Sequence, residues 1–425
     1  MTIHHWLRFA LTFAGAYLLA VQVSAQPVSS DEKIERVVML MRHGVRSPIA
    51  DEVPLDTKTG APWPAWSVPP ETITNHGADV LKALGTTDRT WLSAIGILPT
   101  KACPDPATMV VWTNTAPRTI ATGQAYLQGL APGCALKAGH LPDDQIDPLF
   151  EPTRAPPPWF DAQRAVASIN AYTGGMSVLV QRHAAALGRL EHVLACDTRP
   201  CSPQRAPRLA ATADNRGLVF EGPVRDASGT AQVLMLEYLE GFPLKEVGWG
   251  RANPATLKAV GEVHAALFDV FSRPPYMMAF QTEPTARRII DDFSRPDAPA
   301  FDMLIGHDTN VAALAALLGV AVEAPGFALN DPSPGGALVL ALIRDAHGRA
   351  FVRVYYRSQT ADDIRAMRAH ATWKPLAMKA CKEGPNQMCP LPKFITLLKA
   401  RTAEASAPHS AVDHANDDEP HGAPS

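Results

Sequence analysis

A histidine lies between two arginines in residues 41–48, "MRHGVRSP". Neighbouring cations disfavour the charged imidazolium, so they lower the pKa of the ring and leave it free to act as a nucleophile. The planar fork of arginine donates two hydrogen bonds to a phosphate group. Arg42, His43 and Arg46 are therefore suited to the transfer of a phosphoryl group to histidine, although a solvated basic turn would also contain them.

Two other segments carry complementary groups. Arg118 follows Pro117 in the first turn of an expected helix, and His307 precedes Asp308 in "GHDTN". Arg118 and His307 would add donors to an arginine cradle, while Asp308 would protonate a leaving alcohol and then activate water. Because an ordinary aspartate is ionised at about pH 7, this role predicts activity in acid. Taken singly, Arg118 is a charge at a helix start and His307–Asp308 is a structural pair.

The arginines would supply the charge stabilisation that a metal ion supplies elsewhere, so we expect neither a metal nor a cofactor. The sequence contains no Gly-x-x-x-x-Gly-Lys-Ser/Thr phosphate loop.

Three strand–turn–helix units are expected to position these groups. Residues 34–41, "IERVVMLM", form a continuous apolar run that is typical of a strand buried on both faces. Shorter strands are expected at Met109–Trp112 and Met303–Ile305, followed by helices from Pro117 and from about Asn310. Functional loops of open α/β sheets meet at the carboxyl ends of the strands. The three units therefore predict one shared site.

The middle of the chain differs, because residues 160–200 and 254–293 have helical patterns. Strands return at 337–345 and 350–359, joined by the turn "DAHGRA". The last residues lack apolar side chains. The predicted organisation is a signal peptide at 1–25, an α/β core at 32–149 and 283–402, an inserted mostly α-helical domain at 150–282, and a disordered tail at 403–425.

Composition and charge narrow the class of protein. The chain has 425 residues, of which 46% are hydrophobic, and a formal net charge of −3, so no global field attracts nucleic acid or an anionic membrane. A short apolar run after Arg8 ends in small residues before Gln26, which favours a cleaved export signal over the alternative of a membrane anchor. We expect a periplasmic or secreted protein with no membrane attachment after cleavage.

The cysteine count supports export. Six cysteines in an oxidising compartment predict disulfides rather than free thiols or a zinc site, and no pair has C-x-x-C spacing. We expect sequential pairs, namely Cys103–Cys134, Cys196–Cys201 and Cys381–Cys389.

Taken together, the motifs resemble the histidine acid phosphatase family, in the clade of bacterial periplasmic phytases and glucose-1-phosphatases. The likeness extends from about Glu35 to Leu398 and rests on "RHGVRSP", "PRTIATGQAYLQGLAPGC", "DPLFEP", "EGFPLKEVGWG", "GHDTN", "SPGGALV" and "CKEGPNQMC". The resemblance implies an α/β core sheet flanked by helices, with an inserted helical domain and a cleft between them. It also implies the roles of phosphorylated histidine for His43, proton donor for Asp308, and phosphate binding for Arg42, Arg46, Arg118 and His307.

The substrate is left open between phytate-like and sugar phosphate esters. "GHDTN" is similar to the phytase form, whereas "EYLEGFPLKEVGWG" is nearer the glucose-1-phosphatase segment. Asp51 and Glu52 follow the first motif and would repel a polyanion, although Arg251 or Arg287 could compensate. We expect a monomer that binds a small phosphomonoester.

Two other classes remain. A phosphoglycerate-mutase-like phosphotransferase would use the same phosphohistidine, but export and disulfides argue against it. A non-catalytic protein that binds phosphate esters would need only the arginines, and the presence of both His43 and Asp308 argues against that.

Overall fold

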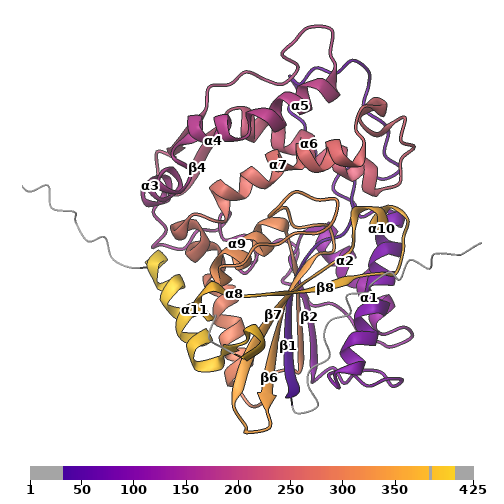
Figure 1. Cartoon of the computed structure of the whole chain (residues 1–425), viewed down its shortest axis with the longest axis vertical. Coiled ribbons are helices and arrows are strands. Elements are labelled where there is room, and N and C mark those ends of the chain that lie inside the picture. Colours follow the sequence, from indigo (N-terminus) through magenta and orange to yellow (C-terminus); the bar gives the residue numbers. More distant parts are fainter. Residues whose placement is uncertain (1–31, 382–384, 407–425) are drawn as a thin grey trace, which may run out of the picture.

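The apolar run at 34–41 lies in β1 (Glu32–Arg42), in the interior of a mixed sheet. The computed structural model describes residues 32–381 and 385–406, so the signal peptide predicted at 1–25 lies outside the described residues. Among the residues described, seven strands form the sheet in the order β2-β5-β1-β6-β7-β8, with β9 paired to β7 (Figure 1). The other strands are β2 (Met109–Thr113), β5 (Phe301–Gly306), β6 (Ala337–Asp345), β7 (Ala350–Ser358), β8 (Thr372–Leu376) and β9 (Cys389–Pro390).

The register of the parallel strands sets the position of the predicted site. β5 pairs in parallel with both β1 and β2, and Arg42 lies opposite Gly306 while Thr113 lies opposite Ile305. The carboxyl ends of the three strands therefore lie side by side at one edge of the sheet. β6 pairs antiparallel with β1 and continues the sheet on the other side.

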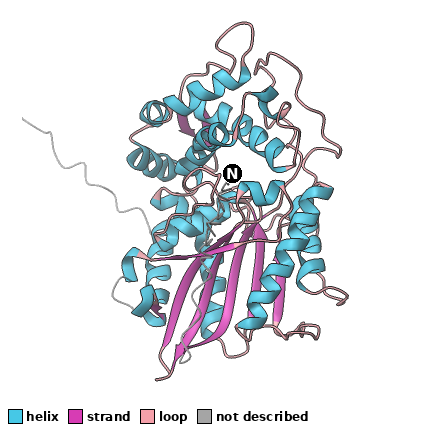
Figure 2. Ribbon diagram, turned by 45° about the vertical axis from the view of Figure 1, so that its right-hand side comes forward, coloured by secondary structure: helices cyan, strands magenta, loops and turns pink. Residues whose placement is uncertain are grey.

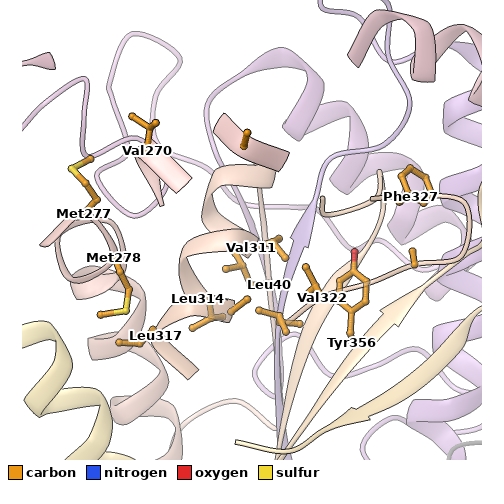
Figure 3. Packing of buried hydrophobic residues seen from close by; sticks show 14 of the residues in the cluster. Leu40, Val270, Met277, Met278, Val311, Leu314, Leu317, Val322, Phe327 and Tyr356 are labelled. Carbon is orange, nitrogen blue, oxygen red and sulfur yellow. The ribbon is translucent and has the colours of Figure 1, made fainter. Parts of the chain in front are cut away.

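Helices cover both faces of the sheet, as Figure 2 shows. Val37, Met39 and Met41 of β1 pack with side chains of α1 (Asn75–Ala94) and α2 (Pro117–Leu130). The alternate residues, Val38 and Leu40, pack with α9 (Asp308–Leu318) and neighbouring elements (Figure 3). Because successive strand residues point to opposite faces, a strand covered on both sides needs an unbroken apolar run.

Two glycines permit the close approach of α1 and α2. A Cβ at Gly85 would lie 2.3 Å from the carbonyl oxygen of Tyr126, and one at Gly129 would lie 1.8 Å from that of Lys82. Any larger residue at either position would push the two helices apart. This packing fixes the position of α2, whose first turn carries Arg118.

A largely helical layer lies above the strand ends (Figure 1). It contains a two-stranded hairpin, which the helical pattern of the middle segment did not predict. The elements are α3 (Ala162–Thr173), α4 (Met176–Arg182), α5 (Ala184–Leu194), β3 (Arg208–Ala211), β4 (Leu218–Glu221), α6 (Pro223–Leu239), a 3-10 turn (Val247–Gly250) and α7 (Pro254–Phe271).

The predicted domain boundary at residue 282 falls inside a helix. α8 (Pro275–Ser294) is continuous through that point and contacts α9, β1 and α11 (Leu391–Ser406) of the core, as well as α3. Residue 282 thus lies within one continuous helix, whose first turns contact Phe160 through Tyr276 and Phe280. The exact division into core and insert otherwise stays a prediction. α10 (Ala361–Arg365) and short 3-10 turns at Lys379–Cys381 and Pro385–Gln387 complete the described elements.

The predicted start of the tail at 403 is also too early. α11 continues to Ser406, because "TAEA" consists mostly of residues with good helix propensity. Residues 407–425 lie outside the described part of the chain. Within the described part, no helix has the length and apolar character needed to cross a bilayer.

All six cysteines are paired in sequential order. The Cα atoms are 5.6 Å apart in Cys103–Cys134, 5.8 Å in Cys196–Cys201 and 5.0 Å in Cys381–Cys389. The first of these links the segment before β2 to the segment after α2.

Candidate active site

The three parallel strands deliver the predicted residues to one place. Arg42 ends β1, and the backbone N–H of His43 donates to Gly306 at 3.0 Å. On the neighbouring side, the backbone N–H of Asn114 donates to Ile305 at 3.0 Å. These bonds continue the strand pairing by one residue and hold the first turns after the strands together.

A pocket of about 380 Å³ opens at this edge. Five of the six residues predicted from the motifs line it, namely His43, Arg46, Arg118, His307 and Asp308. The sixth, Arg42, lies beneath with 1% of its side chain exposed, and its Nη2 is 2.9 Å from Oδ2 of Asp308. The structure thus brings all six together from segments that lie far apart in the sequence.

His43 presents one ring nitrogen as a free nucleophile. Its Nδ1 is 2.9 Å from the carbonyl oxygen of Gly44. Because a carbonyl only accepts, Nδ1 carries the hydrogen, and Nε2 keeps its lone pair. Burial, followed by the charges of Arg118, Arg46 and Arg42, holds the pKa of His43 well below its ordinary value. Burial and the neighbouring charges thus favour the neutral form of the ring.

The arginines leave buried donors without protein partners. The Nε groups of Arg42, Arg46 and Arg118 are buried and have no hydrogen-bond acceptor among the described residues. A buried charged donor without an acceptor is costly. A phosphate group, with three oxygens that accept strong hydrogen bonds, would supply acceptors at this position.

Each of these arginines also has a carboxylate partner. Arg46 makes a two-pronged pair with Glu52 at 2.8 and 2.9 Å, and Arg118 contacts Glu71 at 2.5 Å. The sequence had predicted Glu52 as a rim charge that repels polyanions. Instead, its carboxylate is clamped between Arg46 and the backbone N–H of Ile49, which donates at 2.7 Å.

His307 is held between two polar side chains. The side-chain amide of Asn114 lies 2.7 Å from its Nε2, and Nη2 of Arg118 lies 3.4 Å from its Nδ1. Burial and the nearby charge of Arg118 lower the pKa of His307 to about 3. The rings of His307 and His43 are 5.7 Å apart, centroid to centroid. No local pattern marks Asn114, which follows the end of β2.

Asp308 is ionised in the free site. Burial raises its pKa, but Arg42 and the surrounding histidines outweigh that effect and hold the pKa of Asp308 well below its ordinary value. Its Oδ1 accepts from the backbone N–H of Thr309 at 2.8 Å, so the carboxylate is fixed at the first turn of α9.

Comparison with known proteins places the chain among characterised enzymes. Residues 33–157 match the family model of the histidine phosphatase superfamily, branch 2. The chain is 28% identical over 406 residues to a glucose-1-phosphatase of Salmonella typhimurium, spanning 91% of this chain and 96% of that one. It is 29% identical over 399 residues to phytase AppA of Escherichia coli, spanning 86% of this chain and 91% of that one. The structure of Hafnia alvei phytase in complex with tartrate is 30% identical, with a TM-score of 0.80 over 89% of this chain and 99% of that chain.

The chain belongs to the histidine acid phosphatase family. The resemblance stated from the motifs is thereby confirmed, and so is the predicted α/β fold of a sheet flanked by helices. As a histidine acid phosphatase, the protein is an enzyme that hydrolyses phosphate monoesters.

The basic residues proposed to compensate for the acidic rim do not line the pocket of this phosphatase. Arg251 donates to the carbonyl of Val193 at 2.7 Å, and Arg287 pairs with Glu283 on α8. A different arginine, Arg154, lines the pocket and pairs with Glu151 at 3.0 Å.

A third histidine in the phosphatase site was not predicted from the sequence. His264 of α7 lines the pocket, and its Nδ1 lies 2.8 Å from Oδ1 of Asp331. Neither residue belongs to the two motifs, and 67 residues separate them in the sequence. A lone histidine in a helix gave no sign of this pairing.

Proposed function

We propose that the phosphatase acts through a phosphohistidine formed on Nε2 of His43, with Asp308 as the proton donor. The observation that carries the proposal is the neutral His43 ring, whose free Nε2 lies in the same pocket as the arginine donors. Arg42, Arg46, Arg118 and His307 bind the phosphate oxygens in this proposal.

The reaction has two steps. Nε2 attacks phosphorus while the bond to the ester oxygen breaks, and the arginines stabilise charge on the phosphoryl oxygens. Asp308 gives its proton to the departing alcohol and then takes one from the water that hydrolyses the phosphohistidine. The bound phosphate uses much of the arginine charge, which raises the pKa of Asp308 and allows it to carry that proton.

We further propose that the preferred esters have uncharged leaving groups, such as sugar phosphates, rather than phytate. Beyond the phosphate end, the pocket is lined mostly by uncharged side chains, namely Ile49, Phe150, Thr153, Leu267, Phe271, Gln281 and Thr309. The charged side chains there, Glu151 and Arg154, pair with each other, so they offer little net positive charge to the further phosphates of phytate. Relatives named glucose-1-phosphatase and phytase match almost equally well, so this preference rests on the pocket.

The test of the mechanism is His43→Ala, with His192→Ala as the matched control because His192 is exposed on α5. With nitrophenyl phosphate in acid, His43→Ala should lose activity by about 10⁴-fold or more while keeping the wild-type fold. Acid quenching during turnover should trap phosphate on the wild type and the control, but not on His43→Ala. Covalent phosphate in His43→Ala would refute the nucleophile assignment.

The test of specificity compares kcat/KM for glucose 1-phosphate, phytate and nitrophenyl phosphate at one acid pH. Glucose 1-phosphate should exceed phytate by about tenfold or more, a difference of roughly 1.4 kcal/mol in transition-state binding. A preference for phytate would contradict the reading of the pocket and leave the phosphohistidine mechanism intact.

We also propose that the enzyme is exported to the periplasm or secreted, with residues 1–25 removed. Three disulfides support this, because such bonds persist in oxidising compartments. N-terminal sequencing of the mature enzyme from a cell fraction should begin at Gln26. The expected monomeric state stays a prediction.

A further inference from the structure

His264 faces the proposed proton donor from the opposite wall of the pocket. Its Nε2 is 3.8 Å from Oδ2 of Asp308, while its Nδ1 is 2.8 Å from Oδ1 of Asp331. His264 is 8% exposed and Asp331 is 3% exposed, so the contact between them is shielded from water, whereas the side chain of Asp308 is 19% exposed to the pocket. The ring of Phe268, one turn further along α7, packs edge-on against the imidazole at 5.2 Å and fixes its plane.

The contact between His264 and Asp308 is attractive only when one of the two carries a proton on the facing atom. A carboxylate accepts, so Nδ1 of His264 must carry the hydrogen that points to Asp331. If Nε2 then carried only a lone pair, it would face the Asp308 carboxylate as a second acceptor, which is repulsive. One proton, on either Nε2 or Oδ2, turns this contact into an attraction.

The same short segment holds both partners of Asp308. Asp331 holds His264, and the carbonyl of the next residue, Pro332, accepts from Nη1 of Arg42 at 2.6 Å. Arg42 in turn lies 2.9 Å from the same Oδ2 of Asp308 that faces His264. The charged groups around the His264–Asp308 contact are therefore Asp331 from the segment before β6, Asp308 from α9, and Arg42 from β1.

We propose that His264 is a positioning residue that stores the proton for Asp308 and is itself oriented by Asp331. This role rests on the proposed function, in which Asp308 protonates the leaving group. In the free site the proton resides on Nε2 of His264, between two carboxylates. When a phosphate dianion occupies the arginines, the proton moves to Oδ2 of Asp308, where the leaving oxygen can take it.

The protons balance over the cycle. As the bond from phosphorus to the ester oxygen breaks, the stored proton passes to that oxygen and the alcohol leaves. Asp308 is then a carboxylate that faces the lone pair of His264, and this repulsion makes it a stronger base. The attacking water gives up one proton to Asp308, its oxygen binds phosphorus, the bond to His43 breaks, and the pair regains its proton.

The test uses His264→Asn and Asp331→Asn. Asparagine at 264 can still donate to Asp331 in place of Nδ1, but it has no group at the position of Nε2. Phe268→Leu is the matched control, because it changes the packing against His264 and no titratable group. Thermal unfolding of each variant checks that the fold is kept.

The readout is kcat/KM, which covers the steps up to departure of the leaving group, for two esters. Glycerol 3-phosphate releases a poor leaving group that needs a proton, whereas nitrophenyl phosphate releases a good one. Both asparagine variants should lose about tenfold or more with glycerol 3-phosphate and less than about threefold with nitrophenyl phosphate. Phe268→Leu should change the two values equally.

A second comparison isolates the route through Asp308. In an Asp308→Asn background, adding His264→Asn should cost less than about twofold with glycerol 3-phosphate, because the proton carrier is already gone. Equal losses on both esters, or a full additional loss in that background, would overturn the role of His264. If the wild type hydrolysed neither ester, the proposed function itself would fall, so the two failures are distinguishable.

Discussion

At the scale of single residues, the site pairs each arginine that we propose to bind phosphate with a carboxylate. The pairs are Arg42–Asp308, Arg46–Glu52 and Arg118–Glu71. Their opposite charges nearly cancel in the free enzyme, so the buried guanidinium groups are tolerated without a bound anion. An incoming phosphate must then compete with the carboxylates for the same donors, which weakens the binding of product as well as substrate.

Glu52→Gln should therefore tighten the binding of inorganic phosphate. Glutamine keeps the shape of the side chain but removes the negative charge beside Arg46. The inhibition constant of phosphate should fall by about threefold to tenfold, which corresponds to roughly 1 kcal/mol. Competitive inhibition of nitrophenyl phosphate hydrolysis measures this constant. The control is Glu283→Gln, because Glu283 also pairs with an arginine but does not line the pocket. An unchanged or larger constant would show that Glu52 does not compete with phosphate.

The residues that the sequence predicted are those with a local pattern. Arg42, His43 and Arg46 lie in one motif, and His307 and Asp308 in another, so strand ends and spacing were enough to bring them together. Glu71, Asn114, His264 and Asp331 act through contacts with residues far away in the sequence. No periodicity or motif marks such a pairing, because it depends on the packing of whole elements.

At the scale of elements, α6 buries a carboxyl group. Glu237 is 0% exposed, its Oε2 accepts from the backbone N–H of Gly248 at 3.0 Å, and its Oε1 has no partner among the described residues. Burial raises the pKa of Glu237 from 4.5 to about 8. The helix is therefore joined to the turn at 247–250 by a carboxyl that is neutral in acid.

This burial makes stability depend on pH. Below about 4.5 the group is protonated in both the folded and unfolded states, and between 4.5 and 8 only the folded state keeps the proton. Its contribution to the free energy of unfolding is thus complete in acid and is lost as the pH rises through about 8. Glu237→Gln should resemble the wild type at about pH 4.5 and exceed it by a few kcal/mol at about pH 8.5.

Urea unfolding at several pH values measures that difference. Glu221→Gln, in the partly exposed β4 strand, is the control and should follow the wild type at every pH. If the free energy of unfolding of Glu237→Gln and of the wild type changed with pH in parallel, Glu237 would be ionised in the folded protein.

Helices and strands, like single residues, could be predicted where a local pattern marks them and not where tertiary packing decides them. β1, β2, β5, β6 and β7 were predicted, because strands buried on both faces need continuous apolar runs. α1 was not, since glycines and threonines interrupt its apolar pattern in "NHGADVLKALGTTDRTWLSA". Gly85 is needed there only because α2 packs so closely, which is a tertiary requirement that local propensity cannot reveal.

At the scale of the whole molecule, the disulfides differ in how much chain they close. Cys103–Cys134 spans 31 residues and Cys196–Cys201 spans 5. By loop-closure entropy the first should contribute roughly 3–4 kcal/mol to the free energy of unfolding and the second roughly 2 kcal/mol.

Replacing both members of each pair by serine tests this ordering by urea unfolding. The Cys103→Ser/Cys134→Ser variant should be the less stable of the two, because its closed loop includes β2 and α2, which carry Asn114 and Arg118 to the site. The opposite order would show that local packing, rather than the length of chain closed, decides what each disulfide contributes.

The carboxyl ends of β1 and β5 supply the proposed nucleophile, its neighbouring arginine and the start of α9, whereas α7 supplies His264, Leu267 and Phe271 on the facing wall. In this proposal, phosphoryl transfer and contact with the alcohol therefore use separate stretches of chain that meet at His264. Substitutions at Leu267 and Phe271 should change which alcohol is released while the groups on β1 and β5 stay as they are. Related enzymes can therefore differ in the esters that they prefer through changes in one helix, while the sheet stays the same.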